Sequence, residues 1–142
     1  MKPTLQIGLE SEFTYRISPA QTVPALYPDS PEFQAMPQVF ATGFMVGLLE
    51  LACIKALNPH LDWPREQTVG THVDVSHLAA TPPGLEVTVR VKLVEMEGRR
   101  LVFAVQASDG QDLITQGRHE RFVIDKEKFD RKMRHKAQQP PR

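Results

Sequence analysis

Residues 41–58 read ATGFMVGLLELACIKALN, and this stretch decides the fold. It predicts one long helix, with Thr42 as the N-cap and Asn58-Pro59 as the stop signal. Apolar residues occupy nearly every face of this helix, which is typical of a helix that is buried all round. Glu50 and Lys55 are the exceptions. The rest of the chain must therefore supply a surface that surrounds the helix.

Alternation of apolar and polar residues predicts strands on both sides of the helix. Residues 11–17 alternate before it, with Phe13 and Tyr15 on one face. After the helix, the same alternation predicts four strands at residues 69–77, 85–93, 101–107 and 113–124. Turn-forming segments separate these strands, so we expect them to follow one another as a meander.

This order of elements predicts an α+β fold in which an antiparallel β-sheet wraps around a long central α-helix. This is the hotdog arrangement. A chain of 142 residues fits a single domain over residues 1–142. One such protomer exposes a strand edge that a second copy would cover, so we expect a homodimer, with pairing into tetramers left open.

Composition excludes several classes of protein. Basic and acidic residues number 17 each, which argues against a surface built for nucleic acid. A single cysteine, Cys53, excludes an intramolecular disulfide and a cysteine zinc site. No apolar run is long enough to span a bilayer or resembles a signal peptide, so we expect a cytoplasmic protein without membrane attachment.

Positive charge is concentrated in residues 126–142, which carry seven basic and two acidic residues, a net charge of +5. One interpretation is a solvated C-terminal helix with a frayed end. The other is a basic arm near a polyanionic ligand, such as a nucleotide phosphate.

The segment before the helix combines rigidity with hydrophobicity. Residues 19–37 hold five prolines, which exclude a regular strand or a long helix. Large apolar side chains are nevertheless scattered through residues 23–40 (Val23, Leu26, Tyr27, Phe33, Met36 and Phe40). We expect an ordered loop that packs on the rest of the protein, as lids do.

Glu50 is the most informative candidate for chemistry. A carboxylate in an apolar, buried helix is costly unless it is paired, and burial would raise its pKa and suit it to acid–base or nucleophilic work. The structural alternative is that Glu50 meets an arginine or a water channel and has no catalytic role.

His77 and Thr42 are the next candidates. In the predicted strand, His77 shares a face with Val69, Thr71, Val73 and Val75, with His72, Asp74 and Ser76 opposite. A histidine there is either a satisfied core residue or, near Glu50, a group that moves protons. Thr42 is either a cap or, at a helix N-terminus, a hydroxyl placed to stabilise developing negative charge.

The remaining polar residues give weaker signals. His72 and Asp74 share a strand face, but two ligands without a third make a poor metal site. Arg118, His119, Glu120 and Arg121 form either an ion network or a contact for an anionic ligand. Cys53 is expected to fill space in the core.

At these residues the sequence resembles the fluoroacetyl-CoA thioesterase family of hotdog proteins. The resemblance covers roughly residues 5–135. It lies in Thr42, Glu50, His77, the proline-rich segment, and the stretches VFATGFMVGLLELAC (39–53), VGTHVDVSHLAATPPG (69–84) and GRHERFVI (117–124).

The resemblance implies a homodimer that hydrolyses a short-chain acyl-CoA thioester with a Thr42, Glu50 and His77 set and no metal or cofactor. It further implies that Gly70 helps to hold the thioester carbonyl. The proline-rich segment would form a lid over the acyl group, with Val23, Leu26, Phe33 and Met36 as its apolar residues.

One lid position departs from the family pattern. The fluoroacetyl-selective member carries a phenylalanine where this chain has Met36, and methionine is more flexible than an aromatic gate. We therefore expect a broader or different short acyl group. The alternatives are a hotdog enoyl-CoA hydratase or dehydratase, and a non-catalytic acyl-CoA-binding module.

Overall fold

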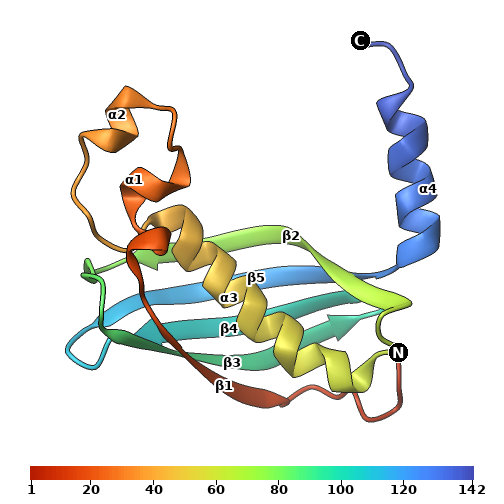
Figure 1. Cartoon of the computed structure of the whole chain (residues 1–142). Coiled ribbons are helices and arrows are strands. Elements are labelled where there is room, and N and C mark those ends of the chain that lie inside the picture. Colours follow the sequence, from red (N-terminus) through yellow and green to blue (C-terminus); the bar gives the residue numbers. More distant parts are fainter.

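The computed structural model describes residues 1–142 as a five-stranded antiparallel sheet with one long helix, α3 (Thr42–Leu57), along one of its faces (Figure 1). This confirms the predicted α+β class and the predicted helix. In sheet order, the strands are β1 (Glu10–Arg16), β3 (Glu86–Glu97), β4 (Arg100–Ser108), β5 (Leu113–Asp125) and β2 (Glu66–His77).

The predicted meander of four strands is wrong for β2. Strands β3, β4 and β5 do pair consecutively, but β2 pairs with β5 and not with β3. The reason is that β1 occupies the other edge of β3, which leaves β2 the opposite edge of the sheet. The connection at residues 78–85 is also longer than the roughly two to five residues of an ordinary hairpin loop.

A β-bulge in β2 decides which of its side chains face the helix. Pairing with β5 shifts immediately after Gly70, and Thr71 is the extra residue. Residues directly opposite each other in antiparallel strands point to the same face. Gly70 lies opposite Arg121 and His77 lies opposite Thr115, and both β5 residues are buried. The bulge therefore turns both Gly70 and His77 toward α3.

The same bulge corrects the predicted faces of two β2 residues. The simple alternation placed Val69 and Thr71 with His77. Instead, Val69 lies opposite the exposed Phe122, and Thr71 donates a hydrogen bond to Glu120 Oε2. Both residues are therefore on the outer face of the sheet, away from α3.

Helix α3 is buried along one side only, so the prediction of burial all round is wrong for this chain. A single sheet covers one side of a helix, and Leu51 and Lys55 are exposed on the other side. The buried residues of α3 pack against the inward side chains of β3 and β4 as one core: Met45, Leu48, Leu49, Ala52, Cys53, Ala56 and Leu57 from the helix, and Val87, Val89, Leu93, Leu101 and Phe103 from the strands.

The segment before α3 folds into short turns of helix, η1 (Pro19–Gln21), α1 (Val23–Leu26) and α2 (Pro31–Gln34). As predicted, it contains no strand or long helix. These turns stand beside the N-terminal end of α3 (Figure 1). Their base is fixed by backbone hydrogen bonds from Val23 N to Val39 O, 3.0 Å, and from Ala41 N to Gln21 O, 3.0 Å.

The basic C-terminal segment forms a helix, α4 (Lys126–Ala137), that leaves the opposite end of the sheet and has no buried residue (Figure 1). The Asp125 side chain caps it by accepting a hydrogen bond from Lys128 N. This agrees with the interpretation as a solvated helix. A short turn, η2 (Asn58–His60), completes the helical elements. None of the helices has both the length and the hydrophobicity needed to cross a membrane.

Candidate functional site

Thr42 and His77 are joined by a hydrogen bond of 2.8 Å between Thr42 Oγ1 and His77 Nδ1. Thr42 is the first residue of α3 and His77 is the last residue of β2. The expected capping role of Thr42 is wrong, because Ala41 is the N-cap and no side chain caps this end. The hydroxyl is instead held by the imidazole, next to the unsatisfied N–H groups of the first helical turn.

Glu50 is paired with Arg121 through a hydrogen bond of 2.8 Å from Arg121 Nη1 to Glu50 Oε2. The predicted burial of Glu50 is wrong for this chain, since its side chain is 38% exposed. Its partner is the buried group, because the side chain of Arg121 is only 2% exposed. Glu50 thus has the arginine partner of the structural alternative, but only its Oε2 is engaged, and Oε1 accepts no hydrogen bond.

Arg121 is fixed by further hydrogen bonds. Its Nε donates to Thr68 Oγ1 at 2.8 Å, and its Nη2 donates to Thr68 O at 2.7 Å. Its Nη1 also lies 3.0 Å from His119 Nε2, and His119 Nδ1 lies 2.8 Å from His72 O. Burial lowers the pKa of His119. A buried polar network therefore reaches the carboxylate of Glu50 from the sheet.

Gly70 lies directly against this carboxylate. A Cβ atom at this position would lie 2.8 Å from Glu50 Oε2, 3.3 Å from His119 Cε1 and 3.5 Å from Arg121 Nη1. Gly70 does not have a positive φ, so close approach rather than backbone conformation explains the glycine. The β-bulge after Gly70 and the pairing with β5 thus bring Gly70, Glu50 and Arg121 together.

The structure brings the candidate residues together as two groups. Thr42 and His77 form one group, and Glu50 with Gly70 and Arg121 forms the other; no hydrogen bond joins Glu50 to Thr42 or His77. Thr42 and Glu50 are eight residues apart on α3, which places them roughly 12 Å apart along the helix axis.

The predicted lid residues lie beside the Thr42 group. A Cβ atom at Gly43 would lie 3.0 Å from Leu26 Cδ2, so α1 rests on the first turn of α3. Phe33 packs against Tyr27, with ring centroids 5.0 Å apart. Val23, Leu26 and Phe33 are partly buried, whereas Met36 is exposed.

Sequence reasoning missed the roles of His119 and Arg121 because residues 118–121 were interpreted as one charged cluster. The structure divides the cluster by strand face. Arg118 and Glu120 point outward, where Glu120 pairs with Arg100, while His119 and Arg121 are buried under α3. No clear signal in the sequence indicated this division, because apolar residues lie on both faces of the strand, with Leu113 and Val123 on the face of His119 and Arg121, and Ile114, Phe122 and Ile124 at the alternate positions.

Cys53, His72 and Asp74 are the weaker candidates. Cys53 is fully buried, and burial raises the pKa of its thiol to about 12, as expected of a residue that fills the core. His72 lies opposite Glu120 and Asp74 lies opposite Arg118. No third residue of a ligand type joins His72 and Asp74 to form a metal site.

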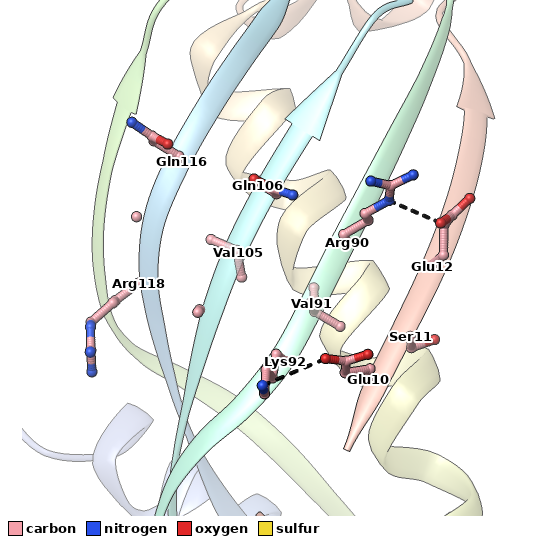
Figure 2. A pocket seen from close by; sticks show the side chains of 12 residues that line it. Glu10, Ser11, Glu12, Arg90, Val91, Lys92, Val105, Gln106, Gln116 and Arg118 are labelled. Carbon is pink, nitrogen blue, oxygen red and sulfur yellow. Dashed lines mark hydrogen bonds and ion pairs between the residues drawn. The ribbon is translucent and has the colours of Figure 1, made fainter. Parts of the chain in front are cut away.

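A second region of interest is a hollow of about 880 Å³ on the face of the sheet away from α3 (Figure 2). Charged side chains of neighbouring strands cross it, with Arg90 paired to Glu12 and Lys92 paired to Glu10. Arg118 of the predicted charged cluster lines this hollow, whereas Thr42, Glu50 and His77 do not.

Comparisons with known proteins agree on one family. The model of the fluoroacetyl-CoA-specific thioesterase family matches residues 23–127. The fluoroacetyl-CoA thioesterase of Streptantibioticus cattleyicolor is 52% identical over 137 residues, which are 96% of this chain and 98% of that protein.

Solved structures show the same similarity. A variant of a fluoroacetyl-CoA thioesterase, in complex with fluoroacetate, superimposes with a TM-score of 0.90 at 50% identity, covering 96% of this chain and 100% of the other. A second variant, in complex with fluoroacetate and CoA, gives a TM-score of 0.85 at 52% identity over 88% of this chain and 99% of the other. A thioesterase superfamily member of Thermus thermophilus gives 0.77 at 32% identity over 95% of each chain.

Proposed function

The chain belongs to the fluoroacetyl-CoA-specific thioesterase family, and from this premise we propose that it hydrolyses short-chain acyl-CoA thioesters to the free acid and CoA, using Thr42, Glu50 and His77. The hotdog fold is common to the chain and its relatives. The observation that carries the residue assignment is the 2.8 Å hydrogen bond from Thr42 to His77 at the N-terminus of α3, beside the lid.

The N-terminus of α3 is suited to binding the thioester carbonyl. The first N–H groups of a helix lack intrahelical partners and carry partial positive charge, so they stabilise the oxyanion that forms on attack. The Thr42 hydroxyl lies at the same place, oriented by His77 Nδ1. His77 accepts the proton of water or returns one to the leaving CoA thiolate.

A carboxylate oxygen of Glu50 acts as a nucleophile or as a general base. Its carboxylate either attacks the carbonyl carbon, forming an acyl–Glu50 anhydride with loss of CoA thiolate, or takes a proton from an attacking water molecule. In a single turnover in ¹⁸O-labelled water, incorporation of ¹⁸O into Glu50 would identify the anhydride route. Only the anhydride route, with water attacking the Glu50 carbonyl carbon, transfers an unlabelled Glu50 oxygen to the acid and leaves ¹⁸O in the protein.

A homodimer completes the site in this proposal. The Thr42 and Glu50 groups are roughly 12 Å apart along one helix, too far to act on one carbonyl. The open side of α3 and the unpaired edge of β2 are both available to a second copy. Each protomer would be a single domain formed by residues 1–142, and each active site would combine Thr42 and His77 of one protomer with Glu50 of its partner.

The lid sets the acyl group that is accepted. Leu26 packs on Gly43, next to Thr42, so the apolar side chains of Val23, Leu26, Phe33 and Met36 would cover the acyl end of the substrate. Met36 is exposed and flexible, and therefore tolerates more than one short acyl group.

The test is release of free thiol from acetyl-, fluoroacetyl-, propionyl-, butyryl- and phenylacetyl-CoA, with Glu50→Gln and His77→Ala beside the unmodified protein. We expect thiol release that both substitutions reduce by about 10²- to 10⁴-fold with folding intact. Near-normal turnover by Glu50→Gln would contradict the assignment. Hydration of an enoyl-CoA without CoA release, or saturable binding without hydrolysis, would contradict the proposed activity.

A further inference from the structure

We infer that His119 is a positioning residue, a neutral imidazole that holds Arg121 against Glu50 Oε2 and so presents Glu50 Oε1 to the substrate. The part of the inference that concerns the catalytic use of Glu50 Oε1 rests on the proposed function. The protonation state of His119 does not depend on the proposed function and is inferred first from hydrogen-bond geometry.

The hydrogen-bond partners of His119 fix its protonation state. Its Nδ1 lies 2.8 Å from His72 O, and a carbonyl oxygen only accepts, so Nδ1 carries the hydrogen. Its Nε2 lies 3.0 Å from Arg121 Nη1, and a guanidinium only donates, so Nε2 carries none. Protonation of Nε2 would place two donors, and two positive charges, face to face.

The surroundings of His119 favour the same neutral state. The residue is only 3% exposed, and burial disfavours the charged imidazolium; the neighbouring cation Arg121 adds to this. Glu50 on α3 and Glu120 on β5 act in the opposite direction, as does the hydrogen bond to His72 O on β2. The balance lowers the pKa of His119.

A neutral His119 provides an acceptor for the second hydrogen of Arg121 Nη1. Arg121 Nε and Nη2 donate to Thr68, and Nη1 has two hydrogens, one for Glu50 Oε2 and one for His119 Nε2. Without an acceptor at Nε2, one hydrogen of Nη1 would be buried without a partner, which is costly. His119 therefore restrains the plane of the guanidinium and the position of Nη1.

This restraint distinguishes the two oxygens of Glu50. Oε2 accepts from Arg121 and is enclosed by Gly70, whose missing Cβ would lie 2.8 Å from it. Oε1 has no hydrogen-bond partner, and the Glu50 side chain is partly exposed. Oε1 is thus the oxygen that is free to attack the thioester or to accept a proton from water.

The test compares His119→Gln with His119→Leu. Glutamine places an amide oxygen near the position of Nε2, where it accepts from Arg121, whereas leucine fills similar space and accepts nothing. We expect His119→Leu to lower kcat roughly 10- to 10²-fold with little change in KM, because Glu50 is misplaced while substrate binding is untouched. We expect His119→Gln to recover most of the loss. Equal kcat values for both variants and the unmodified protein would overturn the inference.

A second measurement does not depend on turnover. Side-chain ¹⁵N NMR distinguishes the two neutral tautomers and the cation of histidine, and comparison with His119→Gln assigns the His119 signal among the five histidines. We expect the Nδ1–H tautomer at pH 7. An Nε2–H tautomer or a cation there would overturn the inference even in an active enzyme. Absence of thiol release with the expected tautomer would instead reject the proposed function.

Discussion

The two faces of the sheet carry ion pairs of similar length in different surroundings. On the α3 face, Arg121 and Glu50 are 2.8 Å apart, and the arginine is almost fully buried. On the outer face, Arg90 and Glu12 are 3.0 Å apart across the hollow of Figure 2, with side chains 65% and 56% exposed. The N···O distance therefore does not distinguish the two pairs, whereas the burial of their side chains does.

The difference shows what each pair contributes. Exposed pairs are screened by water and salt and stabilise a protein by about 0–1 kcal/mol. A buried guanidinium cannot lose its partner without leaving an unpaired charge, so it holds one geometry. The outer pair links two strands at the surface, and the inner pair positions a carboxylate. Four predictions sharpen this comparison, and each has a matched change on the outer face or an internal control.

The largest effect is expected from removing the inner carboxylate. Glu50→Ala should lower kcat by about 10²- to 10⁴-fold, and should lower the free energy of unfolding by about 1–3 kcal/mol because Arg121 loses its acceptor. The matched change, Glu12→Ala, should leave kcat unchanged and alter stability by less than about 1 kcal/mol. Thiol release and urea unfolding measure both effects. Equal effects of the two changes would remove the distinction between the faces.

The next effect tests the arginine itself. Arg121→Lys keeps the charge but loses the planar fork that contacts Thr68, His119 and Glu50 together, so kcat should fall by about 10²-fold. Arg90→Lys should have no effect on kcat, since a single exposed contact does not need the fork. Full activity in Arg121→Lys would show that charge alone is sufficient.

A smaller effect is expected from the close approach at Gly70. In Gly70→Ala the new methyl group meets Glu50 Oε2 at 2.8 Å, so the carboxylate must move and kcat should fall roughly tenfold. The backbone of Gly70 accepts alanine without strain, so the thermal midpoint should change little. If Gly70→Ala lowered the thermal midpoint and left kcat unchanged, the glycine would be required by the strand and not by the position of the carboxylate.

The smallest effect concerns pH. Because the pKa of His119 is lowered in the folded state, the unfolded chain binds more protons below about pH 6.5, and stability should fall as the pH falls through this range. His119→Gln should flatten this part of the curve, whereas Arg90→Lys should not. Unfolding by urea between pH 5 and 8 measures the difference. Identical curves for the unmodified protein and His119→Gln would contradict the assignment.

Local patterns predicted the elements of the fold well. The helix expected at residues 41–58 is found at Thr42–Leu57, and each of the five predicted strands overlaps an observed one, although β2 begins at Glu66 and β3 extends to Glu97. Glu50 was identified because a carboxylate is unusual in such an apolar stretch. Its interest for chemistry therefore came from the sequence, and the roles of Thr42, His77 and the lid came largely from the family resemblance.

Long-range features could not be predicted in the same way. The position of β2 depends on competition with β1 for the edge of β3, which no local pattern records. Apolar residues on nearly every face of α3 suggested burial all round. Hydrophobicity alone does not show whether the same chain covers every side of the helix. Alternation separates His119 and Arg121 from Arg118 and Glu120, but only the structure shows which pair faces α3 and what it contacts.

The bulge in β2 also makes this strand sensitive to its length. Gly70 and His77 are seven residues apart, an odd separation that an unbroken strand would place on opposite faces. Deleting Thr71 would remove the bulge and leave Gly70 and His77 six residues apart, an even separation that keeps both on the α3 face of a straight strand. A one-residue change in length that kept the bulge would instead turn one of the two away from α3. Replacing Thr71 with another residue would leave the count intact. Homologues aligned across residues 69–77 should therefore have either an odd separation between the glycine and the histidine together with a bulge, or an even separation without one.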